Sequence, residues 1–185
     1  MTLEQVSFDA DELAGVGSPF PEELDPLALE QQVCFALAVA SRGVIGVYRP
    51  ILDRLHLTHP QYLVMLALWQ HAPLKVTDLA QLLQLEPATL SPLLKRLEAV
   101  GYVVRERDRS DERALRITLT GEGRDLREQA LAIPGTVMER LDLTLGDVRA
   151  LHGTLTEVIR RVEGAPEHPQ PDGARRVQGR RGPRH

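Results

Sequence analysis

The sequence predicts a mainly helical fold with one small β-hairpin. Apolar residues recur at helical spacing over most of residues 26–162, and a strand-like alternation replaces that spacing only between 102 and 119. Apolar side chains make up 43% of the 185 residues but aromatic ones only 4%, so Leu, Val and Ala must build the core. We expect one domain with the element order α-α-α-α-β-β-α-α.

The charge distribution divides the chain into three parts. Residues 1–30 carry eight acids and no Lys or Arg, and subtracting their −8 from the net charge of −4 leaves +4 on the remainder. We expect residues 1–24 to be a flexible acidic leader and residues 164–185, rich in Arg, Gly and Pro, to be a disordered tail. The tail arginines either add affinity for phosphates or are simply solvated. The folded domain is predicted to cover residues 25–163.

The composition excludes several classes of protein. The single cysteine, Cys34, rules out an intramolecular disulfide framework and a Cys-rich metal site. No stretch approaches the roughly 20 apolar residues that span a bilayer, and the N-terminus lacks the features of a signal peptide. No Ser-His-Asp set or phosphate-binding loop occurs. We therefore expect a cytoplasmic protein without membrane, metal or cofactor, and not an enzyme.

The first two helices are predicted before residue 72. The first is expected over Pro26–Val47, with Pro50 just past its end, and its almost wholly apolar run Val33–Ala40 indicates a subunit interface. The second is expected to begin after Thr58 as N-cap, with Pro60 in its first turn. It is predicted to bury Tyr62, Leu63, Leu66 and Trp69.

Two short helices, Lys75–Leu83 and Pro87–Val100, follow with a tight turn between them, and Gly101 closes the second. The leucines of the helix Pro87–Val100 share one face. The opposite face carries Ala88, Thr89, Ser91, Pro92, Lys95 and Arg96. Short groups can meet base edges in a major groove while the two cations reach phosphates or guanine, so a helix-turn-helix is indicated. A solvated amphipathic helix is the alternative.

The hairpin is predicted from strands Tyr102–Arg107 and Arg113–Leu119, joined by the loop 108–112. Five arginines lie on or beside it: Arg105, Arg107, Arg109, Arg113 and Arg116. An arginine at the tip can enter a narrow minor groove, and Asp111 can hold the Arg113 guanidinium in place. An ordinary surface hairpin is the alternative.

The remaining elements are helical. Thr120 is expected to cap a helix that reaches about Leu131, and Pro134–Gly135 is expected to interrupt or kink it. Thr144 and Asp147 resemble a capping box for a last helix that ends near Val162.

Taken together, these segments resemble the MarR family of winged-helix regulators, and within it the organic-hydroperoxide-sensing, OhrR-like subgroup with one cysteine. The similar runs are VCFALAVASRGVIGVYRPIL (33–52), LTHPQYLVMLALWQH (57–71), LAQLLQLEPATLSPLLKRLEAVGYV (79–103), RDRSDERALRITLTGEG (107–123) and ALAIPGTV (130–137). The D-x-R pattern at Asp111 and Arg113 is typical of the broad family, whereas CFAL, YRPIL and IPGT are typical of the subgroup.

The resemblance implies a winged helix-turn-helix that dimerises through its N- and C-terminal helices. It implies a homodimeric repressor that binds a pseudo-palindromic operator in double-stranded DNA. Thr89, Ser91, Pro92, Lys95 and Arg96 would lie on the recognition helix, Arg113 would be the minor-groove residue with Asp111 as its support, and Cys34 would be the sensor thiol for organic hydroperoxides or related oxidants.

The chain itself adds three constraints on such a sensor. Tyr48, the expected hydrogen-bond donor to the thiol, lies 14 residues after Cys34, which is about 21 Å along one continuous helix. The pair can therefore act together only across a dimer. His59 stands where the subgroup pattern has a tyrosine; it would donate a hydrogen bond or, as a cation, lower the pKa of the thiol, unless it is a half-exposed residue with no role. Ala38, often aromatic in relatives, leaves a roomier pocket.

With no second cysteine, Cys34 is expected to form a sulfenic acid and then a mixed disulfide with a low-molecular-weight thiol, or to be overoxidised. Three alternatives stay open. The first is a regulator that is released by a small molecule, with Cys34 as a bystander. The second is a thiol peroxidase, and the third is a metal sensor that uses some of the six histidines.

Overall fold

The computed structural model describes residues 25, 27–107 and 115–164. The chain divides into two compact units, one running to Leu141 and the other beginning at Asp142. The predicted leader, the tail beyond 164, and the wing loop with Asp111 and Arg113 lie outside the described residues.

The first long helix, α2, spans Val33–Leu52 and follows a short 3-10 turn, η1, at Leu29–Gln31. It begins later than predicted, because Gln32 before it is extended. It also ends later, because Pro50 lies inside the helix and does not stop it. A proline removes only its own N–H from the hydrogen-bond series, and the next turn still closes, with the Asp53 N–H donating to the Arg49 carbonyl.

Helix α2 leaves most of its apolar side chains uncovered. Leu52 is its buried residue, whereas Val33 is 70% and Val39 44% exposed. With the 3-10 turn η2 (Asp53–Leu55), it forms a span, Val33–Leu55, with a mean hydropathy of 1.3, long and apolar enough to cross a bilayer by length and composition alone. This corrects the expectation that no such stretch exists. Leu52 and Leu55 belong to the core, and Val47, Tyr48 and Ile51 pack against it. The exposed apolar residues Val33, Leu37, Val39 and Ile45 offer a face to a further partner.

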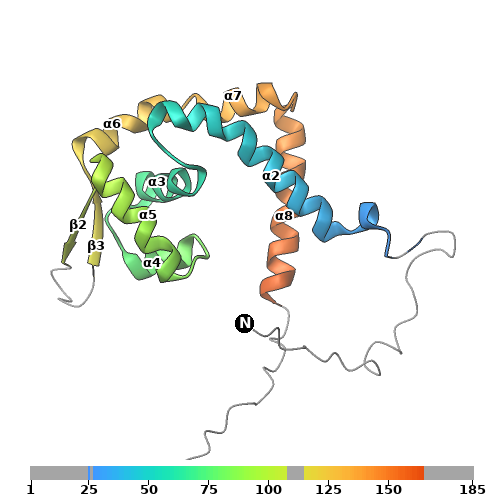
Figure 1. Ribbon diagram of the computed structural model, residues 1–185, viewed down its shortest axis with the longest axis horizontal. Coiled ribbons are helices and arrows are strands. Elements are labelled where there is room, and N and C mark those ends of the chain that lie inside the picture. Colours follow the sequence, from blue (N-terminus) through green and yellow to red (C-terminus); the bar gives the residue numbers. More distant parts are fainter. Residues whose placement is uncertain (1–24, 26, 108–114, 165–185) are drawn as a thin grey trace, which may run out of the picture. The chain divides into compact units, whose positions relative to one another are not determined.

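In chain order, the other elements of the first unit are α3 (His59–His71), β1 (Leu74–Lys75), α4 (Val76–Leu82), α5 (Pro87–Val100), β2 (Val103–Arg107), β3 (Leu115–Leu119), α6 (Gly121–Ala130) and α7 (Ile133–Arg140). Helices α3, α4 and α5 gather beside a small sheet, and α6 and α7 follow it (Figure 1). The sheet is antiparallel in the order β1-β3-β2. The predicted hairpin is therefore present, and a third strand of two residues, which was not predicted, joins it.

The core lies where α3, α5 and β3 meet. Side chains that are almost wholly buried include Val64, Met65, Leu68, Leu90, Leu94, Leu97 and Ile117. The predicted burial of Leu63 is wrong, because that side chain is 39% exposed while its neighbour Val64 points inward. An all-round apolar helix gives no period from which its inner face can be read.

The predicted caps at Thr58 and Gly101 are confirmed. Thr58 and Gln61 form a capping box at the start of α3, and Gly101 ends α5 with a φ of 93°. The break after α6 falls at Leu131–Ala132, because Pro134 occupies the first turn of α7, where its missing N–H costs nothing.

The second unit contains helix α8, which spans Leu145–Glu163. Thr144 and Asp147 form the predicted capping box at its start. Its apolar residues are largely exposed, among them Leu151, Ile159 and Val162.

Candidate nucleic-acid interface and thiol site

Helix α5 presents the surface that the sequence predicted. All six residues of its predicted outer face, Ala88, Thr89, Ser91, Pro92, Lys95 and Arg96, are exposed. Leu90, Leu94 and Leu97 on the other side are buried and hold the helix on the core. The Ser91 hydroxyl donates to the Pro87 carbonyl at 2.9 Å, so its oxygen remains an acceptor for an outside donor.

The wing strands carry charge beside this helix. Glu106 is paired in register with Arg116, and Arg107 with Leu115, next to the loop 108–114. The sequence pattern groups Arg105 with the other arginines of the hairpin. In the structure, however, Arg105 is paired with an acidic side chain. Its Nε donates to a carboxylate oxygen of Glu98 at 2.7 Å. Arg109 and Arg113 lie outside the described residues, and Arg107 is exposed.

A cluster of three rings forms where α2 meets α3. The Tyr48 and His59 rings lie edge to face with their centroids 5.3 Å apart, and Tyr62 lies 5.9 Å from Tyr48. Tyr62 was missed as a member of this cluster, although its position three residues after His59 on a helix could have indicated it.

Cys34 lies apart from these rings within one chain. It is exposed in the first turn of α2, while Tyr48 is near the other end of the same unbroken helix, about 21 Å away at the usual rise per residue. The structure therefore brings Tyr48 and His59 together and separates both from the thiol of their own chain.

Burial sets the protonation of two members of the cluster. It raises the pKa of Tyr48 above its ordinary 10.0 and lowers the pKa of His59 below 6.5. In the single chain Tyr48 is therefore a phenol and His59 a neutral imidazole near pH 7, and each can donate one hydrogen bond. This favours the donor role over the cation role for His59.

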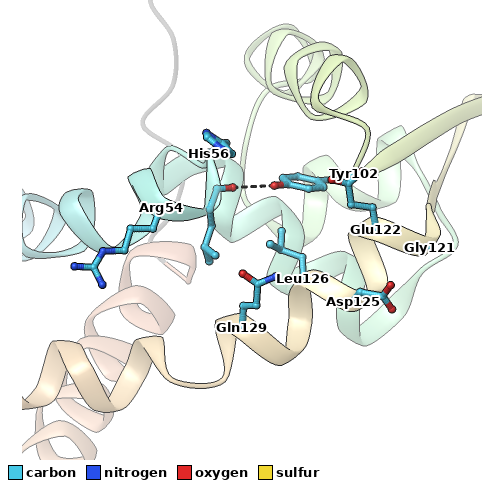
Figure 2. Close-up of a pocket in the computed structure, with 9 residues that line it drawn as sticks. Arg54, His56, Tyr102, Gly121, Glu122, Asp125, Leu126 and Gln129 are labelled. Atoms are coloured by element: carbon cyan, nitrogen blue, oxygen red, sulfur yellow. Dashed lines mark hydrogen bonds between the residues drawn. The ribbon is translucent and has the colours of Figure 1, made fainter.

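A buried hydrogen bond connects the turn that follows α2 to the residue before strand β2. The Tyr102 hydroxyl donates to the Leu55 carbonyl at 3.1 Å (Figure 2). The bond lies at a pocket of about 410 Å³ that Arg54 and His56 line together with Glu122 and Asp125 of α6. Tyr102 directly precedes β2, so the bond ties the turn after α2 to the base of the wing.

No metal site accompanies these features in the part of the chain that the structure describes. Among residues 25, 27–107 and 115–164, no three His, Cys, Asp or Glu side chains come close enough together to hold an ion.

A helix-turn-helix followed by an antiparallel wing defines a winged-helix DNA-binding protein. Residues 57–115 match the MarR family. The organic hydroperoxide resistance transcriptional regulator of Bacillus subtilis is 41% identical over 137 residues, which cover 74% of this chain and 93% of that protein. The chain belongs to the MarR family of transcriptional regulators.

Solved structures agree with this assignment. AbfR of Staphylococcus epidermidis has been solved in reduced and in overoxidized form, each bound to DNA. Each of these two structures is 33% identical to this chain with a TM-score of 0.60, and the match covers 94% of AbfR and 72% and 73% of this chain.

Proposed function

We propose that the protein is a cytoplasmic homodimeric repressor whose grip on its operator is controlled by oxidation of Cys34. One observation carries the proposal: the only cysteine in the sequence is exposed on a helix whose apolar residues Val33, Leu37 and Val39 are exposed among the residues that the structure describes. The chain is similar to an organic hydroperoxide resistance regulator over 93% of that regulator's length, which supports an organic hydroperoxide as the oxidant. The working domain would be residues 25–163.

The DNA contacts of this repressor would come from α5 and the wing. Thr89, Ser91 and Pro92 would approach base edges in the major groove, while Lys95 and Arg96 would reach phosphates or guanine. In the wing loop, Arg113 would enter the minor groove and Asp111 would hold its guanidinium. The exposure of the helical residues supports the first part of this assignment.

The thiol site would be completed by the second chain. If the α2 helices of two chains lie antiparallel, Cys34 of one reaches the end of the other that carries Tyr48, and His59 of α3 lies beside this Tyr48. Two neutral donors would then stabilise the thiolate, which is the reactive form of cysteine. The exposed apolar residues of α2, Val33, Leu37 and Val39, support such pairing.

The proposed chemistry balances without a second cysteine. The thiolate attacks one oxygen of the hydroperoxide, the O–O bond breaks, and the products are a sulfenic acid on Cys34 and an alkoxide that takes up a proton to give an alcohol. A low-molecular-weight thiol then displaces water from the sulfenic acid and forms a mixed disulfide. The added group would disturb the dimer interface and move the two wings apart.

The test is binding to the DNA upstream of the protein's own gene, with and without cumene hydroperoxide. Wild type is expected to release this DNA on oxidation and Cys34→Ser to stay bound. Mass spectrometry of the released protein is expected to find an oxidised or thiol-linked Cys34. Release of DNA while Cys34 is unmodified, or equal release of Cys34→Ser, would contradict the proposal.

A second candidate function is release by a small molecule. A mostly apolar cavity of about 160 Å³ lies between α3 and the helices α6 and α7, with Tyr62, Trp69 and Leu131 in its wall and Arg127 beside them. A small apolar acid could bind there. Release of Cys34→Ser from DNA by such a compound, with no response of wild type to hydroperoxide, would favour this function.

A further inference from the structure

An ion pair connects the recognition helix α5 to the wing. We propose that Glu98 and Arg105, here called the brace, fix the angle between α5 and strand β2 and so position both elements for DNA. In this role they are positioning residues and make no DNA contact themselves. The inference rests on the DNA-binding function proposed above and concerns residues that this function does not use.

The chain brings the two residues together by a sharp reversal. Glu98 lies in the last turn of α5, Gly101 turns the chain with its φ of 93°, and Arg105 is the central residue of β2. The guanidinium donates through two nitrogens to Oε2 of Glu98, with Nε at 2.7 Å and the terminal nitrogen at 2.5 Å. Such forked contacts fix direction as well as distance.

The carboxylate of Glu98 also holds the backbone of the strand. The Arg105 N–H donates to Oε1 of Glu98 at 3.2 Å. Strand β2 is at the edge of the sheet, with β3 on one side only, so this N–H is satisfied by the helix in place of a further strand. Attachment through both side chain and backbone of one residue restrains the strand against sliding and against rotation.

The charge of Arg105 is already neutralised. Its hydrogen bond, chiefly, lowers the pKa of Glu98 below the ordinary 4.5, so the carboxylate remains ionised at neutral pH. A guanidinium that must leave a carboxylate before it reaches a phosphate gains less from DNA than a free one. Lys95 and Arg96 on α5 and Arg107 on β2 are exposed and are the better phosphate ligands.

The experiment measures operator affinity and its salt dependence by fluorescence anisotropy, with the full chain reduced. Glu98→Gln and Arg105→Gln are each expected to bind about threefold to tenfold more weakly than wild type. The double variant is expected to bind no more weakly than either single one. The slope of log affinity against log salt is expected to stay unchanged in all three, because no phosphate contact is lost.

Two further variants separate positioning from simple charge effects. Glu106→Gln removes one negative charge, as Glu98→Gln does, but at the exposed residue that follows Arg105 on β2. This variant is expected to bind DNA as well as wild type or better. Arg105→Lys keeps the positive charge but loses the fork, so it is expected to weaken binding as Arg105→Gln does. Because both brace side chains are about one-third exposed, at 31% and 34%, the variants are expected to fold, which circular dichroism checks.

Three results would overturn the inference. The first is tighter binding by Glu98→Gln, which would mean that the released Arg105 is a DNA ligand. The second is a salt slope reduced by about one in Arg105→Gln but restored in Arg105→Lys. The third is wild-type affinity in both Gln variants. Failure of wild type itself to bind the operator would instead contradict the proposed function.

Discussion

At the scale of single residues, Gly123 is the glycine with the least room for a side chain among the residues that the structure describes. A Cβ on it would lie 2.0 Å from the carbonyl oxygen of Tyr102. Its own carbonyl accepts a hydrogen bond from the Trp69 indole at 2.8 Å, and its N–H is capped by Thr120. Only a residue without a side chain lets α6 approach the base of the wing this closely.

Gly123→Ala is therefore expected to lower the free energy of unfolding by about 2–3 kcal/mol, since the clash is with backbone and cannot be relieved by a rotamer change. Urea unfolding measures this. Gly121→Ala is the matched control on the same helix, because nothing lies within 4 Å of its Cβ position. Equal stability of the two variants would show that α6 shifts freely.

His59 gives the fold a dependence on pH. Burial lowers the pKa of His59 in the folded chain below 6.5, the ordinary value that applies to the unfolded chain. Between the folded-state pKa and 6.5, the unfolded chain therefore binds a proton that the folded chain does not. Stability therefore falls as the pH is lowered through about 6.5.

His59→Gln is expected to lose less stability than wild type between about pH 7.5 and about pH 5.5, because it lacks this proton uptake on unfolding. Thermal unfolding across that range measures the difference. His71→Gln, at an exposed histidine on the same helix, is expected to follow wild type. Parallel curves for wild type and His59→Gln would contradict the assigned pKa shift.

At the scale of elements, the hydroxyl of Tyr102 joins the turn after α2 to the base of β2. Tyr102→Phe keeps the buried ring but leaves the Leu55 carbonyl without this donor. We expect a loss of about 1–2 kcal/mol in the free energy of unfolding, with an unchanged dependence on denaturant. Urea unfolding at fixed protein concentration measures it. Full stability of Tyr102→Phe would mean that water replaces the hydroxyl at no cost.

The elements also separate what the sequence could reveal from what it could not. The N-caps Thr58, Thr120 and Thr144 and the C-terminal Gly101 were predictable because capping depends on residues within one turn. The two-residue strand β1 was not, since it forms only by pairing Leu74 with Ile117, far along the chain. A proline inside a helix reads as a stop, so the end of α2 was placed too early.

Some functional residues could likewise be predicted from nearby sequence, whereas others depend on contacts that form only in the folded chain. The outer face of α5 could be read from helical periodicity, because its inner face is a regular series of leucines. The partner of Arg105 could not, because Glu98 comes near it only after the chain reverses at Gly101. The separation of Cys34 from Tyr48 was predictable from helix length alone, but the ring contact of Tyr48 with His59 needed the packing of α2 on α3.

At the scale of the whole molecule, each proposed thiol site would be formed jointly by two chains. Helix α2 carries Cys34 at its start and Tyr48 near its end, so a dimer with two such sites would exchange these ends between chains. Oxidation at either site would then act on the interface that sets the spacing of the two recognition helices.

The most direct test mixes two defective chains. Dimers of Cys34→Ser alone, and dimers of a Tyr48→Phe, His59→Phe double variant alone, are both expected to respond slowly or not at all to hydroperoxide. A mixed dimer of the two has one intact site, with Cys34 from one chain and both donors from the other. We expect rapid release of operator DNA by co-expressed mixed dimers; release no faster than that of the two parent dimers would contradict a thiol site built across the dimer.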